Sequence, residues 1–235
     1  AAVIGLGKSL KLQVTAEAGT VVAFVDNAPT GFVQGKDYVT IVSDDLYQMG
    51  EKAADAMAAA IGGKGKVGYL FHDANFYVTN QRDGAFKQTI GQKYPDIEIV
   101  AEMGLADPAK AEDIINAFML KNPDLDAVYV TWAEPAEFVL AALRNNGNTT
   151  TKIVTLDLSE PLALDMVKDG NVAAIVADEA YMIGQTLARA AAASLVGEKL
   201  QPFYAVDALA VTKDNVKEGW FQSLHRDPPA SLTGG

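Results

Sequence analysis

The sequence contains no cysteine and only two histidines, His72 and His225. Without cysteine, disulfide bonds, thiolate metal sites and cysteine nucleophiles are all excluded, and two histidines are too few for a histidine-rich metal site. No apolar run reaches the roughly 18 residues that a membrane-spanning helix needs. No basic segment precedes the apolar residues at the start, so we expect that a signal peptide was never present or lies outside the sequence.

Basic residues are also scarce: 19 lysines and arginines face 30 aspartates and glutamates, for a formal charge of −11. Binding to phosphate backbones needs a basic face, and no cluster of lysine or arginine occurs, so we expect no nucleic-acid partner. The acidic residues are spread along the chain, a pattern typical of a solubilising surface.

Sequence signatures of enzymes are weak. There is no Walker loop and no Gly-x-Ser-x-Gly elbow, and Gly5-Leu6-Gly7-Lys8 lacks the third glycine of a dinucleotide-binding turn. Two aspartates could approach each other as the carboxylate pair of a glycosidase does, but the spacing singles out no such pair. We therefore expect no catalytic residue, no cofactor and no metal.

What the sequence does contain is an alternation of short β-branched runs with longer segments of helical period. Most of the early runs are continuously apolar, which is typical of parallel strands covered on both faces. The expected strands are residues 2–6, 21–25, 39–43, 66–71, 126–132, 152–156, 172–177, 203–206 and 208–211.

The segments between these strands have recognisable helix ends. Ser43 or Asp44 is expected to cap a helix that ends at Gly62-Gly63, and Asp107-Pro108 opens another. Further helices are expected at 134–146, from Ser159 to Gly170, and at 180–196. Repeated strand–helix–strand units predict an α/β fold with doubly wound parallel sheets.

In open α/β sheets, ligands bind beyond the carboxyl ends of the strands. Polar or aromatic residues stand at the carboxyl ends of five of the expected strands: Asp26-Asn27, His72-Asp73, Thr131-Trp132, Asp157 and Asp178. Carboxylates accept hydrogen bonds from hydroxyl groups and aromatic faces pack on sugar rings, so the set suits a sugar or polyol.

Each of these residues also has a plainer interpretation. An aspartate between a strand and a helix often serves only as a cap, and Trp132 could be a core aromatic residue. Arg82, near the start of a helix, could lie on the surface or could reach the crevice and donate several hydrogen bonds to hydroxyl groups.

Six segments carry a resemblance to a known family: VVAFVDN at 21–27, TIVSD at 40–44, NQRDGAF at 80–86, PDLDAVYV at 123–130, IVTLD at 153–157 and GNVAAIVAD at 170–178. In their order and spacing, the sequence resembles the periplasmic sugar-binding proteins of ribose-type ABC importers. These proteins share their fold with the effector-binding cores of lactose-repressor-like regulators.

The resemblance implies polar contacts to sugar hydroxyl groups from Asp26, Arg82 and Asp157. Trp132 and Asp178 stand where ribose-type proteins tend to have amides, and Asp73 stands where an apolar contact is common. These differences imply a ligand other than ribose, such as a longer or more hydroxylated polyol. The ligand-binding residues expected from spacing and resemblance together are Asp26, Asn27, Asp73, Arg82, Trp132, Asp157 and Asp178.

The resemblance also implies two lobes, with chain crossings near Ser43, Asp178 and Val206. We expect residues 1–42 and 179–206 in the first lobe, residues 43–178 and 207–225 in the second, and a flexible tail at 226–235. Family members begin with a strand, helix, strand and helix that have no counterpart before residue 2, so we expect an incomplete first lobe and a truncated or incompletely recorded chain.

The function expected is that of a monomeric periplasmic binding protein, which captures a sugar or polyol between its lobes by hinge closure and delivers it to a membrane permease. Two alternatives stay open: the effector-binding core of a transcriptional regulator, and an α/β enzyme that acts on a sugar.

Overall fold

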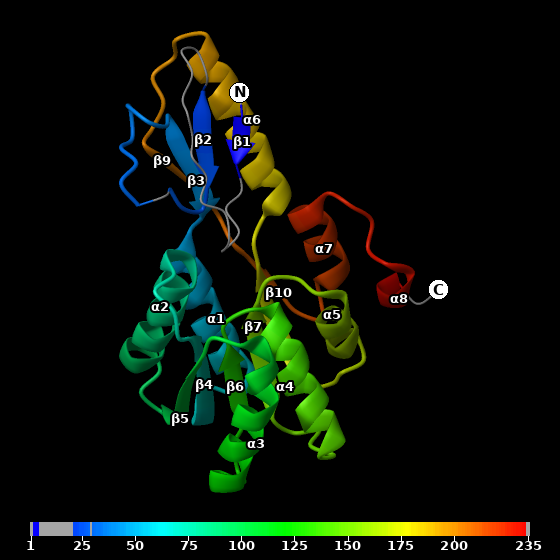
Figure 1. Ribbon diagram of the computed structural model, residues 1–235. Coiled ribbons are helices and arrows are strands. Elements are labelled where there is room, and N and C mark those ends of the chain that lie inside the picture. The colour runs from blue at the N-terminus through cyan, green and yellow to red at the C-terminus, as the bar shows by residue number, and fades with distance from the viewer. Residues whose placement is uncertain (1, 5–20, 29, 234–235) are drawn as a thin grey trace. The chain divides into compact units, whose positions relative to one another are not determined.

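The chain forms two compact units in the computed structural model, which describes residues 2–4, 21–28 and 30–233 (Figure 1). The first unit comprises Ala1–Asp45 and Glu179–Asp207, and the second comprises Leu46–Asp178 and Ala208–Gly235. The sequence placed the ends of the first lobe's segments at 42 and 206, where the units end at 45 and 207. The Gly5-Leu6-Gly7-Lys8 segment lies outside the described residues.

The first unit contains a parallel sheet with strand order β1-β2-β3-β9. Its strands are β1 (Ala2–Ile4), β2 (Val22–Val25), β3 (Thr40–Asp44) and β9 (Phe203–Val206), and helix α6 (Ala180–Leu195) packs on β2, β3 and β9. Ile183 and Leu187 of α6 are buried against Ala23 and Val42. On the other face of β2, the Phe24 ring packs against Phe32 and Tyr38, so both faces of this continuously apolar strand are covered.

The second unit contains a six-stranded sheet with strand order β10-β8-β7-β6-β4-β5. All neighbouring strands are parallel except β10, which runs antiparallel to β8. The strands are β4 (Gly65–His72), β5 (Ile97–Leu105), β6 (Ala127–Val130), β7 (Lys152–Leu156), β8 (Val172–Ala177) and β10 (Leu209–Val211). The predicted α/β fold with parallel sheets is confirmed.

Helices cover both faces of this sheet (Figure 1). On one face lie α1 (Leu46–Ala60) and α2 (Tyr77–Lys93), which bury Tyr69 and Tyr129. On the other lie α3 (Ala111–Lys121, preceded by the 3₁₀ turn η1, Pro108–Lys110), α4 (Ala133–Asn145) and α5 (Glu160–Val167), which bury Val128 and Val130. Because consecutive side chains of β6 face opposite helical layers, all four of its residues are buried, as its unbroken apolar sequence predicted.

Several details differ from the expectation. Ser43 and Asp44 lie in β3, and the Ser43 hydroxyl, one of the two expected caps of α1, donates to Asp26 Oδ1 at 3.2 Å. Strand β5 and helix α7 (Val216–Leu224) were not expected. Arg82, expected near the start of a helix, lies in α2, which already begins at Tyr77. Where the sequence predicted a flexible tail, the structure has α8 (Ala230–Thr233), because Leu232 buries its side chain in the core.

No helix within 2–4, 21–28 and 30–233 combines the length and the apolar character required to cross a membrane.

The contact between α1 and α2 is close enough that backbone meets backbone. A Cβ atom at Gly50 of α1 would lie 2.3 Å from the carbonyl oxygen of Arg82, 2.6 Å from Ala85 Cβ and 2.7 Å from the amide nitrogen of Phe86. Only glycine fits here, so Gly50 sets the distance between α1 and the turn of α2 that carries Arg82.

This contact predicts opposite effects for two glycine-to-alanine substitutions. Gly84→Ala, on α2 with open space around the new Cβ atom, should stabilise the second unit by about 0.5–1 kcal/mol through helix propensity. Gly50→Ala should destabilise it by about 1–3 kcal/mol, because α2 must move away. Both tryptophans, Trp132 and Trp220, lie in this unit, so denaturant unfolding followed by tryptophan fluorescence measures the difference. Equal stabilisation by both changes would contradict the close approach.

Candidate ligand-binding site

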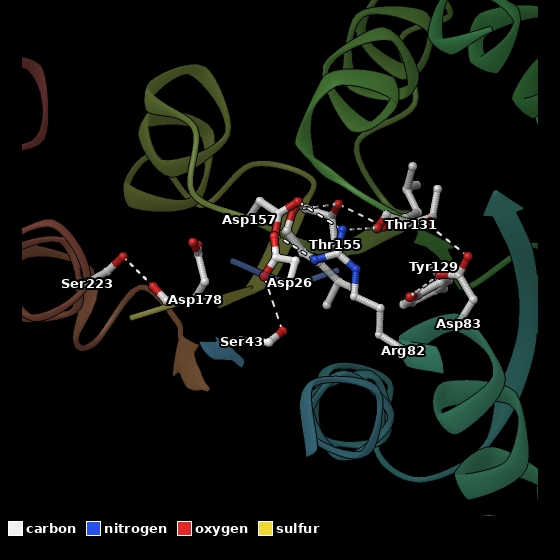
Figure 2. A network of polar contacts seen from close by, with 12 residues as sticks. Asp26, Ser43, Arg82, Asp83, Tyr129, Thr131, Thr155, Asp157, Asp178 and Ser223 are labelled. Carbon is white, nitrogen blue, oxygen red and sulfur yellow. Dashed lines mark hydrogen bonds and ion pairs between the residues drawn. The ribbon is translucent and has the colours of Figure 1, made fainter. Parts of the chain in front are cut away.

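Arg82 lies on the inner face of α2, with 6% of its surface exposed. Its guanidinium group binds Asp157 in a bidentate manner: Nη1 donates to Oδ1 at 2.8 Å and Nη2 donates to Oδ2 at 3.1 Å. Nη2 also approaches the main-chain carbonyl oxygen of Thr131 at 3.3 Å. Figure 2 shows the three residues converging from α2 and from the carboxyl ends of β6 and β7.

Asp157 has an uncommon backbone conformation that directs its carboxylate. It follows β7 with a φ angle of 67°, in the left-handed region that aspartate tolerates better than most residues. Its amide still donates to Val176 of the neighbouring strand at 2.9 Å, so the chain leaves the sheet in a defined direction. The conformation leaves the carboxylate at the sheet edge, half-buried and paired with Arg82.

The first unit repeats this arrangement. Asp26 follows β2 with a φ angle of 64°, and its amide donates to Val42 of the neighbouring strand at 3.0 Å. Its carboxylate accepts from Ser43. Each unit therefore presents one left-handed aspartate at the carboxyl end of a parallel strand.

The charge state of Arg82 is fixed by its surroundings. Burial alone would lower the pKa of the guanidinium, but the charge and hydrogen bonds of Asp157 outweigh burial and raise the pKa above its ordinary value. Asp157 and Thr131 engage both Nη atoms, whereas Arg82 Nε is buried and has no acceptor in the part of the chain that the structure describes. The Nε–H group of the Arg82 cation is thus a buried donor to which no described residue binds.

Asp83, the next residue of α2, is a second buried charged group, with 3% of its surface exposed. Its Oδ1 accepts from the Tyr129 hydroxyl at 2.7 Å, and its Oδ2 accepts from the Thr131 hydroxyl at 2.9 Å and from the His72 amide at 2.9 Å. Burial raises the pKa of Asp83, and these three hydrogen bonds, together with Arg82, reverse only part of the rise. Burial and the Asp83 charge also raise the pKa of Tyr129 far above its usual range, so its hydroxyl stays a donor.

Aromatic rings support this hydrogen-bonded cluster. The Phe86 and Tyr129 rings stack at 4.0 Å between centroids, and Tyr69 stacks beside Tyr129 at 5.5 Å. At the end of β4, the His72 ring contacts the Trp132 ring edge to face at 4.9 Å, and His72 Nδ1 lies 2.7 Å from the Thr79 hydroxyl. The carboxyl ends of β4 and β6 are thereby linked through side chains as well as through the sheet.

The structure brings some of the expected site residues together and separates others. In the second unit, Arg82 and Asp157 are in contact, and Trp132 directly follows Thr131, to which Arg82 binds. Asp178 lies beside Ser223 and apart from the Arg82–Asp157 pair (Figure 2). Asp73 is exposed and lines a hollow of about 440 Å³ together with His72, Asn80 and Asp83. Asp26 and Asn27 belong to the first unit.

The sequence did not identify Asp83 or Tyr129 as parts of this cluster. The available signal was the helical spacing of Asp83, Phe86 and Ile90, which places all three on the buried face of α2. No group of three or more histidine, aspartate or glutamate side chains among the described residues is placed to bind a metal ion.

Comparison with known proteins decides the family. Residues 11–199 match the model of the periplasmic binding protein domain. The chain belongs to this family. The resemblance that the sequence motifs carried is therefore confirmed.

Curated relatives are ribose import binding proteins. The protein from Salmonella typhimurium is 28% identical over 177 residues, which cover 75% of this chain and 59% of the relative; that from Bacillus subtilis is 28% identical over 169 residues, which cover 72% and 53%. The chain thus spans less than two thirds of the length of these relatives. Among solved structures, an ABC transporter solute-binding protein from Agrobacterium vitis bound with α-D-tagatopyranose matches with a TM-score of 0.75 at 25% identity, covering 86% of this chain and 70% of that one.

The raised pKa of Asp83 predicts a pH-dependent effect of Asp83→Asn on stability. A buried carboxylic acid whose pKa is raised stabilises the fold below its unfolded value of about 3.9, and this contribution is lost as the pH rises through the folded value. Asparagine does not titrate, so the free energy of unfolding of the variant should increase relative to wild type as the pH rises above about 4. Denaturant unfolding at a series of pH values, followed by tryptophan fluorescence, measures this difference.

Asp124→Asn is the matched control, because Lys66 lowers the pKa of the exposed Asp124. The free energy of unfolding of Asp124→Asn should decrease slightly relative to wild type as the pH rises, and this change should occur below about pH 4. A pH-independent difference for Asp83→Asn would mean that Asp83 does not titrate as its burial implies.

Proposed function

We propose that this chain is the ligand-binding part of an ABC importer's solute-binding protein and that it binds a sugar or polyol without converting it chemically. The observation that carries the proposal is the buried Arg82 guanidinium, which is held by Asp157 and Thr131 at the carboxyl ends of parallel strands. Ligands of open α/β sheets bind at this edge.

The donors and acceptors at this edge suit hydroxyl groups. The unused N–H of Arg82 Nε is a donor for a sugar oxygen, and the half-buried Asp157 carboxylate is an acceptor for a sugar hydroxyl. The partly buried Trp132, next to Thr131, offers an apolar ring surface of the kind that packs on sugar rings. Since Asp157 already balances the charge of Arg82, we expect an uncharged ligand in preference to a sugar phosphate.

The relatives favour an importer over the alternatives considered from the sequence. The curated relatives are named as import binding proteins, and the Agrobacterium vitis structure is named as a transporter solute-binding protein. We propose by extension a periplasmic location, a monomeric state and a membrane permease as the partner. Capture by hinge closure, with further ligand contacts from Asp26, Asn27, Asp73 and Asp178, stays a prediction that rests on the family resemblance.

A thermal-shift screen with pentoses, hexoses and polyols tests the proposal. A ligand that binds only the folded chain raises the melting temperature, by an amount equivalent to about 2.7 kcal/mol at a hundredfold excess over Kd. We expect a shift with one class of uncharged sugar or polyol and none with a sugar phosphate. Unchanged melting with every compound, measured also with a longer version of the chain, would contradict the proposed function.

Replacing Asp157 with alanine should weaken binding of that ligand at least tenfold, measured by calorimetry below the melting temperature of the variant. The substitution removes a ligand acceptor and also releases the guanidinium group of Arg82. Asp169→Ala is the matched control, since Asp169 is another left-handed aspartate of the second unit, with a φ angle of 56° and an ion pair to Lys213. If Asp157→Ala binds the ligand with unchanged affinity, Asp157 is not part of the ligand-binding site.

A further inference from the structure

Two consecutive residues of α2 hold Thr131 from two sides. The Thr131 hydroxyl donates to Asp83 Oδ2 at 2.9 Å, and the Thr131 carbonyl oxygen accepts from Arg82 Nη2 at 3.3 Å. Thr131 itself is fully buried and its amide donates to Leu70 of β4 at 3.1 Å. Every polar group of Thr131 therefore has a partner, and two of the three partners are adjacent residues of one helix.

Asp83 is the centre from which this arrangement is organised. Its carboxylate collects hydrogen bonds from β6, through Tyr129 and Thr131, and from the end of β4, through the His72 amide. Its main-chain carbonyl oxygen accepts from the Tyr69 hydroxyl at 2.8 Å. A carboxylate with 3% of its surface exposed is costly to bury unless such donors surround it. The hydrogen bonds together fix α2 against the ends of β4 and β6; Figure 2 shows Asp83 with its β6 partner Tyr129 and with Thr131.

We infer that Asp83 is a positioning residue for the ligand site: through Thr131 it fixes the place of the Arg82 guanidinium group relative to Asp157. This inference rests on the proposed function for its effect on ligand affinity, although the effect on Arg82 itself is independent of any ligand. Asp83 does not contact the ligand in this scheme. It acts through the hydroxyl of Thr131, whose carbonyl oxygen is one of the two acceptors that hold Nη2.

Thr131→Val removes the hydroxyl group and leaves the size of the side chain nearly unchanged, so it tests the connection between Asp83 and Arg82. Thr151→Val is the matched control. Thr151 is also buried, and its hydroxyl donates to the main-chain carbonyl oxygen of Leu125 and accepts from Asn148 Nδ2, each at 2.9 Å. Thr151 precedes β7, whereas Asp157 follows β7. Both variants lose one buried hydroxyl donor, and only one loses it at the site.

The first readout needs no ligand. The chain has four arginines, so an NMR spectrum of arginine Nε–Hε groups is simple, and Arg82→Lys identifies the signal of Arg82. We expect that signal to shift or broaden in Thr131→Val, to stay in place in Thr151→Val, and to return in Thr131→Ser, which keeps the hydroxyl group. An Arg82 signal that is the same in Thr131→Val as in wild type overturns the inference.

The second readout is the affinity for the sugar that the thermal-shift screen identifies. We expect a decrease of about tenfold in Thr131→Val, within twofold of wild type in Thr151→Val, and recovery in Thr131→Ser. Equal loss in both valine variants would indicate a general effect on stability and would overturn the positioning role. If the wild-type chain binds no sugar, the proposed function fails, while the Arg82 signal still decides the inference. If Thr131→Val does not fold, Tyr129→Phe replaces it in both readouts, because Tyr129→Phe removes the donor to Asp83 Oδ1.

Discussion

A buried guanidinium group must be surrounded by acceptors, and in this chain that requirement connects α2 with the carboxyl ends of β6 and β7. Arg82 cannot lose its proton, and burying its charge without partners would cost several kcal/mol. The cost is offset by the bidentate contact with Asp157 and by the carbonyl oxygen of Thr131. The close backbone contact at Gly50 sets the position of α2 relative to α1, so the packing of two helices and the geometry of the candidate site depend on each other.

Two aspartates with left-handed backbone conformation explain why parallel strands suit such a site. Asp26 and Asp157 each follow a strand, and each keeps one amide hydrogen bond to the next strand while turning the chain out of the sheet. A residue with a branched Cβ atom would be strained in this conformation. A single aspartate therefore ends each strand and presents a carboxylate at the edge where ligands of this fold class bind.

Continuous apolar runs made strands such as β6 and β8 recognisable in the sequence. The expected bounds of β7, β8 and β9 agree with the structure, and the apolar runs of β6 and β8 correspond to burial by two helical layers. Strand β5 escaped notice because it is an edge strand that exposes Glu98 and Glu102, and so lacks a continuous apolar run. The sequence did not predict the bounds of α2, because its inner face carries Thr79, Arg82 and Asp83 in place of an unbroken apolar stripe.

For the candidate site, the sequence supplied individual residues but no contacts. The rule that ligands bind beyond strand ends selected Asp157 and Trp132, and the resemblance selected Arg82. The contact between Arg82 and Asp157 joins residues 75 positions apart, and no spacing in the sequence encodes it. Asp83 and Tyr129 could not be selected by the same rule, because one lies within a helix and the other within a strand. Their role follows from the hydrogen bonds, which only the folded chain defines.

If the buried Nε–H group of Arg82 donates to a sugar ligand, its NMR signal must respond when that ligand binds. The most direct test is an NMR titration of the arginine Nε–Hε signals in the wild-type chain with the ligand found by thermal shift. We expect the Arg82 signal to move and to saturate with the Kd of binding, while the signals of Arg144, Arg189 and Arg226 stay in place. A saturating thermal shift together with an unmoved Arg82 signal would show that the ligand binds elsewhere and would contradict the account.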